Sequence, residues 1–193
     1  MKLRYLVPAL ALALTTVAAQ AQIGVYVNPI VTRVSNSKAD TGPFAFLGDG
    51  DTSQIFGGVN LGGYYTFVQY PKFDISVDVR DSIEHGNNAL LNSFLVGPRV
   101  ALHPVAWGVK PYAQVSIGAG RTHSPLNTAI TTKLEFDGFV GADKALNKHV
   151  DWRIVEVGYG SVTTTSSEVH QSGTSIPAAK LLNVSAGLVF RFK

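Results

Sequence analysis

The residues most able to do chemistry in this chain are its five histidines and the serines close to two of them. His170 and Ser172 stand two positions apart, so an extended segment would hold both on one side, as a nucleophile and its general base require. Glu168 is the nearest acid. The stretch around them is rich in glycine and serine, which indicates a polar loop, and we expect no catalytic centre there. His123 and Ser124 end a predicted strand and are discounted likewise. The other histidines stand near turns or strand ends: His85, His103 and His149.

A second group with chemical potential consists of acidic and arginine side chains on the polar face of alternating segments. Its members are Asp74, Asp78, Arg80, Arg99, Glu135, Asp137, Asp143 and Arg153, with Glu156 added if the seventh segment contains a bulge near Val155. Such carboxylates could hold a cation or act as an acid–base pair. We expect instead that they pair with the arginines across a narrow interior, because a guanidinium binds carboxylates through two hydrogen bonds. Metal-ligand spacing, phosphate-binding glycine loops and a triad order are all missing from the sequence, so no metal and no cofactor is expected.

The elements that would position these side chains are strands, because apolar and polar residues alternate along most of the chain after Gln22. The clearest case is FDISVDVR at residues 73–80, in which every second residue is apolar. No segment shows a helical period. The sequence predicts eight strands, near residues 23–35, 53–67, 73–80, 91–103, 111–122, 131–144, 151–162 and 182–192.

The connections between these strands alternate in predicted length. Short ones are expected at residues 68–72, 104–110 and 145–150, and long ones at residues 36–52, 83–90, 123–130 and 163–180. In an up-and-down barrel, successive connections emerge at opposite ends, and outer-membrane barrels have short periplasmic turns and longer outer loops. The pattern therefore predicts an all-β fold, an eight-stranded antiparallel up-and-down transmembrane barrel with both termini at the short-turn end.

Alternation alone does not say whether the apolar face points inward, as in a soluble lipocalin-type barrel, or outward to lipid. The polar face favours the lipid-facing interpretation, because it is rich in arginine, aspartate and glycine and poor in lysine. Aromatic residues also gather near the short turns, as in the girdle of a membrane interface. The predicted girdle residues are Phe67, Tyr70, Phe73, Trp107, Tyr112, Trp152 and Phe192. A strand of about ten residues, tilted near 45°, spans about 23 Å, which fits the apolar band of such barrels.

The first 21 residues have the features of a cleavable signal peptide, which leaves residues 22–193 as the barrel domain. Lys2 and Arg4 precede an apolar run that is too short for a membrane helix, and Ala19 and Ala21 stand where a signal peptidase reads small residues. Their removal lowers the formal net charge from +3 to +1, so charge gives no argument for nucleic-acid binding. The chain has no cysteine, which excludes disulfides, catalytic thiols and a lipoprotein anchor.

Several short motifs resemble the small single-domain OmpA-like outer-membrane β-barrel proteins. They are YYT at 64–66, FDISVDVR at 73–80, LVGPR at 95–99, KPY at 110–112, GAD at 141–143 and WRIVE at 152–156. The last strand is similar to the terminal signal that the barrel-assembly machinery reads, although Lys193 follows the aromatic Phe192. No peptidoglycan-binding domain follows, so the cell-wall tethering of longer relatives is not implied. The resemblance covers essentially all of residues 22–193.

These observations together predict an outer-membrane protein without enzymatic activity. It would support envelope integrity or bind surface partners through its long loops. The expected partners are outer-membrane lipids, the barrel-assembly machinery and surface ligands, with no nucleic acid, and the protein is expected to be a monomer. Three alternatives stay open at this point: a lipid-modifying enzyme, a secreted soluble barrel that binds an apolar ligand, and a small channel.

Overall fold

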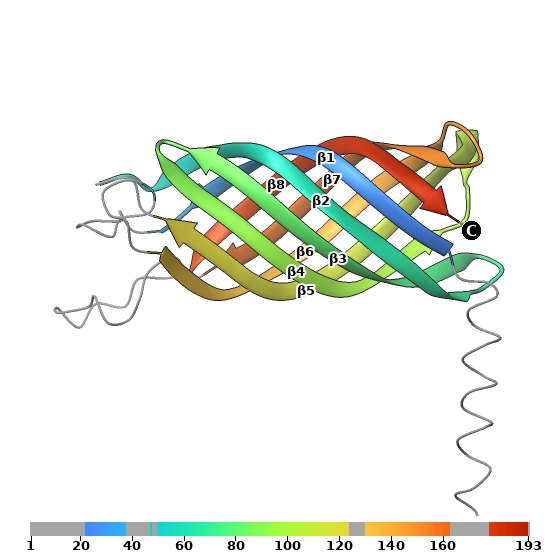
Figure 1. Ribbon diagram of the computed structural model, residues 1–193, viewed down its shortest axis with the longest axis horizontal. Helices are drawn as coiled ribbons and strands as arrows, with labels where there is room; N and C mark the ends of the chain where they lie inside the picture. Colours follow the sequence, from blue (N-terminus) through green and yellow to red (C-terminus); the bar gives the residue numbers. More distant parts are fainter. Residues whose placement is uncertain (1–21, 38–46, 48–49, 124–129, 163–177, 193) are drawn as a thin grey trace, which may run out of the picture.

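The computed structural model describes residues 22–37, 47, 50–123, 130–162 and 178–192, which form a closed antiparallel barrel of eight strands. The strands follow one another around the barrel in chain order, and the first pairs with the last (Figure 1). They are β1 (Gln22–Ser35), β2 (Ser53–Gln69), β3 (Phe73–Gly86), β4 (Ala89–Leu102), β5 (Val109–His123), β6 (Ile130–Ala145), β7 (Val150–Val162) and β8 (Ala179–Phe192). The predicted fold class is therefore confirmed. Within the described residues, no helix is long and apolar enough to cross a bilayer.

One predicted long loop is wrong. Residues 83–90 were expected to form a long connection, but β3 continues to Gly86 and β4 begins at Ala89. Only Asn87 and Asn88 join them, with φ angles of 48° and 59°. Positive φ at both central residues is the conformation that a two-residue hairpin requires, and asparagine is one of the few residues that adopt it readily. The composition of HGNN at residues 85–88 is typical of a loop, but here it encodes a tight turn.

Apart from the β3–β4 turn, the short connections lie at one end of the barrel and the long connections at the other, as predicted. Short connections join β2 to β3, β4 to β5 and β6 to β7, and the second contains the short 3-10 helix η2 (Ala106–Gly108). The start of β1 and the end of β8 lie at this same short-turn end (right in Figure 1). The strand ends that are joined by the connections 36–52, 123–130 and 163–180 lie at the opposite end, called the loop end below. Most of their residues lie outside the described part of the chain.

Most of the buried, inward-facing side chains are polar or charged, and most of the outward-facing side chains are apolar. On β1, Tyr26, Asn28 and Thr32 point inward and are buried, whereas Val25 and Val31 alternate with them and are exposed. The same alternation holds on the other strands, and buried charged residues come from β3, β4, β6 and β7. A soluble ligand-binding barrel would show the reverse distribution.

The seventh strand contains the bulge that its sequence suggested. Arg153 pairs with Gly187 of β8, and Glu156 pairs with Ser185. Between these two pairs, β7 has two residues and β8 has only one, which defines the bulge. The β6–β7 pairing is shifted at the same place. Because the extra residue resets the alternation, both Arg153 and Glu156 point into the barrel.

Candidate functional site: a charged barrel interior

The middle of the barrel holds a continuous chain of ion pairs. Glu156 is at its centre and accepts hydrogen bonds from Arg80 Nη1 at 3.0 Å and from Arg153 Nη1 at 3.3 Å. Arg80 Nε also donates to Asp78 at 3.1 Å. These side chains come from β3 and β7, so the chain of ion pairs crosses the lumen rather than following one wall. All four side chains are buried.

Asp143 extends this chain toward the short-turn end. One of its carboxylate oxygens accepts from Arg153 Nε at 3.0 Å, and the other accepts from Arg99 Nη2 at 3.0 Å. Each carboxylate of this stretch therefore lies against at least one guanidinium. That arrangement matters because a buried charge without a partner is costly by several kcal/mol. The structure brings together six of the nine predicted interior residues in this way: Asp78, Arg80, Arg99, Asp143, Arg153 and Glu156.

Tyrosine rings lie between the arginines. One of them, Tyr112, is not where the sequence predicts it. Tyr112 was expected in the outer girdle, but it is buried in the lumen, where its hydroxyl donates to Glu156 Oε2 at 2.6 Å. The guanidinium carbon of Arg99 lies 4.3 Å from the Tyr64 ring centre and 4.1 Å from that of Tyr112. Stacking of this kind attracts the cation to the ring and desolvates it together with its carboxylate.

Sequence reasoning also missed Tyr26, Tyr64 and Gln114. The Tyr26 hydroxyl lies 3.0 Å from both oxygens of Asp78, and Gln114 Nε2 donates to the same carboxylate at 2.8 Å. A usable signal was present, because each tyrosine shares its strand face with small polar residues. Nearness to a short turn was the weaker guide for Tyr112, since the face of the strand decides whether a ring meets lipid or the lumen.

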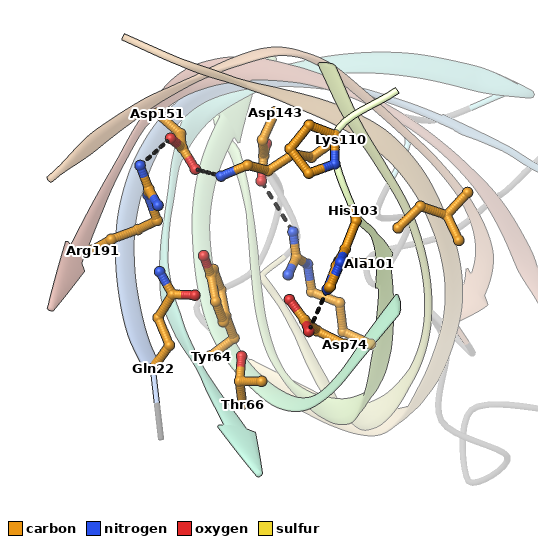
Figure 2. A pocket seen from close by; sticks show the side chains of 13 residues that line it. Gln22, Tyr64, Thr66, Asp74, Ala101, His103, Lys110, Asp143, Asp151 and Arg191 are labelled. Carbon is orange, nitrogen blue, oxygen red and sulfur yellow. Dashed lines mark hydrogen bonds and ion pairs between the residues drawn. The ribbon is translucent and has the colours of Figure 1, made fainter. Parts of the chain in front are cut away.

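At the short-turn mouth, the interior opens into a polar cavity of about 60 Å³ (Figure 2). Asp151 lies between two cations there, with Lys110 Nζ at 3.1 Å and Arg191 Nη2 at 2.9 Å. Asp74 was expected in the interior network, but it is only half-buried and pairs with His103 Nε2 at 3.1 Å instead of an arginine. Figure 2 shows that Asp151 with its two cations and Asp74 with His103 line the cavity. Paired polar and charged side chains therefore line this mouth.

The loop half of the interior differs from the rest. Glu135 and Asp137 were expected to pair with arginines, and the described residues contain no such pair for either. Ser93 Oγ donates to Glu135 at 2.7 Å, and Asn183 Nδ2 donates to Asp137 at 3.3 Å. Glu84, which was not predicted, is buried in the same region.

An apolar cluster inside the barrel includes residues at the loop ends of several strands. Its members are Val34, Leu47, Phe56, Ala89, Leu91, Val162, Ala179 and Leu181. Leu47 comes from the long connection between β1 and β2, and the other members come from the strands. From the loop end to the short-turn end, the lumen therefore contains four layers. They are this apolar cluster, the carboxylates of Glu84, Glu135 and Asp137, the arginine–tyrosine network, and the charged residues of the mouth.

The other predicted girdle residues lie on or near the outer surface at the short-turn end. Trp107 is 89% exposed at the tip of the β4–β5 connection. Tyr70 and Phe73 contact each other with ring centres 4.7 Å apart. The remaining three project outward from the ends of their strands: Phe67, Trp152 and Phe192.

The candidates for catalysis fall mostly outside the structure. Ser124, Glu168, His170 and Ser172 all lie outside the described residues. Within the described residues, no group of three or more acidic, histidine or cysteine side chains is arranged to hold a metal ion. His149 is in the β6–β7 turn, where its backbone N–H donates to Asn147.

No protein-family model matches the sequence, and no curated protein is significantly similar to it. Solved structures are similar in fold. Neisserial surface protein A superimposes with a TM-score of 0.56 and 14% identity, over 88% of this chain and 97% of that one. Ail, the attachment invasion locus protein of Yersinia pestis, gives a TM-score of 0.51 and 12% identity, over 89% of this chain and 99% of that one.

The fold therefore defines the class: a small eight-stranded transmembrane β-barrel, similar in fold to these two neighbours. At these low identities the likeness concerns the fold alone. The resemblance to the OmpA-like barrels continues to rest on the sequence motifs.

Proposed function

We propose that this protein is a monomeric, non-enzymatic protein of the bacterial outer membrane, exported by a signal peptide that ends at residue 21. It supports envelope integrity or binds surface partners through its long loops. The observation that carries this proposal is the inversion of polarity: the outer wall is apolar, and the interior is charged and filled. A barrel of this kind is stable only where its wall meets hydrocarbon.

The outer wall supports the lipid-facing part of the proposal in detail. Exposed valine, leucine, isoleucine and phenylalanine side chains occur on all eight strands. Exposed apolar patches on soluble monomers rarely exceed a few hundred Å², whereas this apolar surface surrounds the barrel. Lipid tails are the partner that such a surface fits. The last strand alternates in the same way up to Phe192, which supports recognition by the barrel-assembly machinery.

The interior supports a protein that does not conduct solutes. The ion pairs between Arg80, Glu156, Arg153 and Asp143 cross the lumen, and the apolar cluster fills part of it. An eight-stranded barrel is just wide enough for side chains to fill its interior. Opening a path would require several buried ion pairs to break together.

The loops are the proposed place of any binding specificity. Connections 36–52, 123–130 and 163–180 are rich in serine, threonine, glycine and asparagine, which are residues suited to polar contacts. Among the structural neighbours, Ail is described as an attachment invasion protein and has been solved with the heparin analogue sucrose octasulfate (TM-score 0.52, 12% identity). Surface attachment is therefore one role to test for the loops of this chain.

The test of the main proposal is membrane fractionation followed by gel electrophoresis with and without boiling. We expect the protein in the urea-washed outer membrane, with a mobility that changes on boiling because a folded barrel resists the detergent. A protein found soluble in the periplasm or the medium, with no mobility change, would contradict the proposal. An altered lipid A composition that depends on His170 would contradict the non-enzymatic part alone.

A further inference from the structure

Three buried carboxylates in the loop half of the barrel have no cationic partner. Glu84, Glu135 and Asp137 are each at most 2% exposed. All other buried acidic side chains form ion pairs with arginine or lysine, but in the part of the chain that the structure describes these three form none. Ionised carboxylates in such a place are strongly destabilising unless something neutralises them.

Hydrogen bonds compensate for only part of this charge. Glu135 and Asp137 are two positions apart on the inward face of β6, so their like charges repel each other. The hydrogen bonds from Ser93 and Asn183 stabilise these charges without cancelling them.

Oxygen atoms without partners surround a small cavity at this place. Asn60, Glu84 and Asp137 each have one buried side-chain oxygen with no hydrogen-bond partner. All three residues line a cavity of about 10 Å³, together with Glu135. A cavity of this size has room for about one water-sized occupant. Asn60 is an independent indication of a ligand. The residue is 1% exposed, and its neutral amide oxygen needs a cation or a hydrogen-bond donor next to it.

We propose that this chamber, lined by Asn60, Glu84, Glu135 and Asp137, binds one monovalent metal cation of the size of Na⁺. Carboxylate and amide oxygens are the ligands that hard cations prefer. A divalent ion is disfavoured, because the oxygens without partners come from only two carboxylates and a neutral amide, and no three acidic side chains of the described residues are arranged to hold a metal ion.

The surroundings of the chamber fit a cation. On its inner side, Arg80 lines the same cavity, but its guanidinium is already bound to Asp78, Glu156 and Gln114. Leu91 and Leu181, which belong to the apolar cluster, also line the cavity and keep bulk water from screening the charges. Lys133 is half-buried two positions before Glu135 on the inward face of β6, and it is the nearest basic residue along that strand.

The first test needs no variant. The purified chain, folded in detergent micelles, is unfolded by urea in NaCl and in choline chloride at equal ionic strength, because choline is too large for the cavity. A cation that binds only the folded state lowers the unfolded fraction about elevenfold when it is present at ten times its dissociation constant. We expect this stabilisation to saturate with Na⁺ and to disappear at acidic pH, where protons compete for the same oxygens.

Matched variants locate the effect. Glu84→Gln removes a charge from the chamber, whereas Asp74→Asn removes one from the opposite mouth, and both replace a carboxylate with an amide of the same shape. Glu84→Gln should abolish the difference between Na⁺ and choline, and Asp74→Asn should preserve it. The mobility change on boiling checks that each variant has folded. Calorimetric titration of NaCl into the wild-type protein measures the binding directly.

Two results would overturn the proposal. Equal stability in NaCl and choline chloride would mean that protons alone neutralise the three carboxylates. A Na⁺ effect that survives in Glu84→Gln would place the cation elsewhere on the protein.

Discussion

At the scale of single residues, the stability of the interior depends most on Glu156. Its two oxygens receive hydrogen bonds from Arg80, Arg153, Tyr112 and Ser185. Arg80 and Arg153 have other partners, Asp78 and Asp143, but Glu156 is the acid that both share. Removing its charge would leave two desolvated guanidinium groups with less compensation than they need.

Glu156→Gln is therefore expected to destabilise the folded barrel by about 3–5 kcal/mol, the usual effect of breaking a buried ion pair. The measurement is urea unfolding in lipid vesicles, followed by tryptophan fluorescence. Asp74→Asn is the control, because its pair with His103 is partly exposed and contributes about 0–1 kcal/mol. Similar losses for the two variants would show that burial of the network has little energetic effect.

At the scale of elements, turns and glycines determine how closely the strands approach. Asn87 and Asn88 close the β3–β4 hairpin in a conformation that β-branched residues avoid. Gly97 of β4 faces the barrel interior. It lies so near to β5 that a side-chain carbon at this position would collide with the backbone oxygen of Val115. Both features are local, yet each controls the register or the spacing of a strand pair.

Asn88→Val should lower the stability by about 1–3 kcal/mol, because valine at positive φ is strained. Asn88→Gly should cause no loss, since glycine adopts positive φ without strain. Urea unfolding of both variants checks this. An equal loss for glycine would mean that the asparagine side chain itself, rather than the backbone conformation, stabilises the turn.

Gly97→Ala is expected to destabilise by about 1–3 kcal/mol, because the strand backbone must move to admit a methyl group. Gly57→Ala is the matched control. An added carbon at Gly57 meets no atom within 4 Å, so the change should stay within about 0.5 kcal/mol. Thermal unfolding of the two variants separates crowding from the general effect of replacing glycine, and equal losses for the two variants would show that crowding is unimportant.

At the scale of the whole molecule, the barrel is a ring of apolar side chains around a charged interior. Its membrane placement predicts that the cost of a charge on the outer wall depends on depth. Val96 and Leu102 both point outward from β4, Val96 near the middle of the strand and Leu102 at its short-turn end. A barrel in water would tolerate arginine equally at the two positions.

Val96→Arg should destabilise the barrel by about 2–4 kcal/mol and Leu102→Arg by about 0–1 kcal/mol. Folding into lipid vesicles, measured as a function of urea concentration, gives both values. Equal small effects would argue that the wall does not contact hydrocarbon, and the proposed location in the outer membrane would then fail together with this prediction.

The sequence by itself determined the number of strands and which face of most strands is polar, because alternation in a strand assigns each side chain to one of two faces. Residues 73–80 show this: Asp78 and Arg80 are inside and Val77 and Val79 are outside, as their spacing predicts. Alternation does not determine the ends of strands or the length of the β3–β4 connection, because HGNN is compatible with a loop and with a tight turn.

Only the tertiary structure decided which charges meet. Sequence alternation placed Arg80 and Glu135 on the same polar lumen face, but it contains no information about height along the barrel axis or about position around it. Those depend on strand tilt, register and the bulge in β7, which together bring Arg80 to Glu156 and leave Glu135 beside Asp137 and Ser93. Tyr112 was misassigned for the same reason, because distance from a turn does not determine the direction of a side chain.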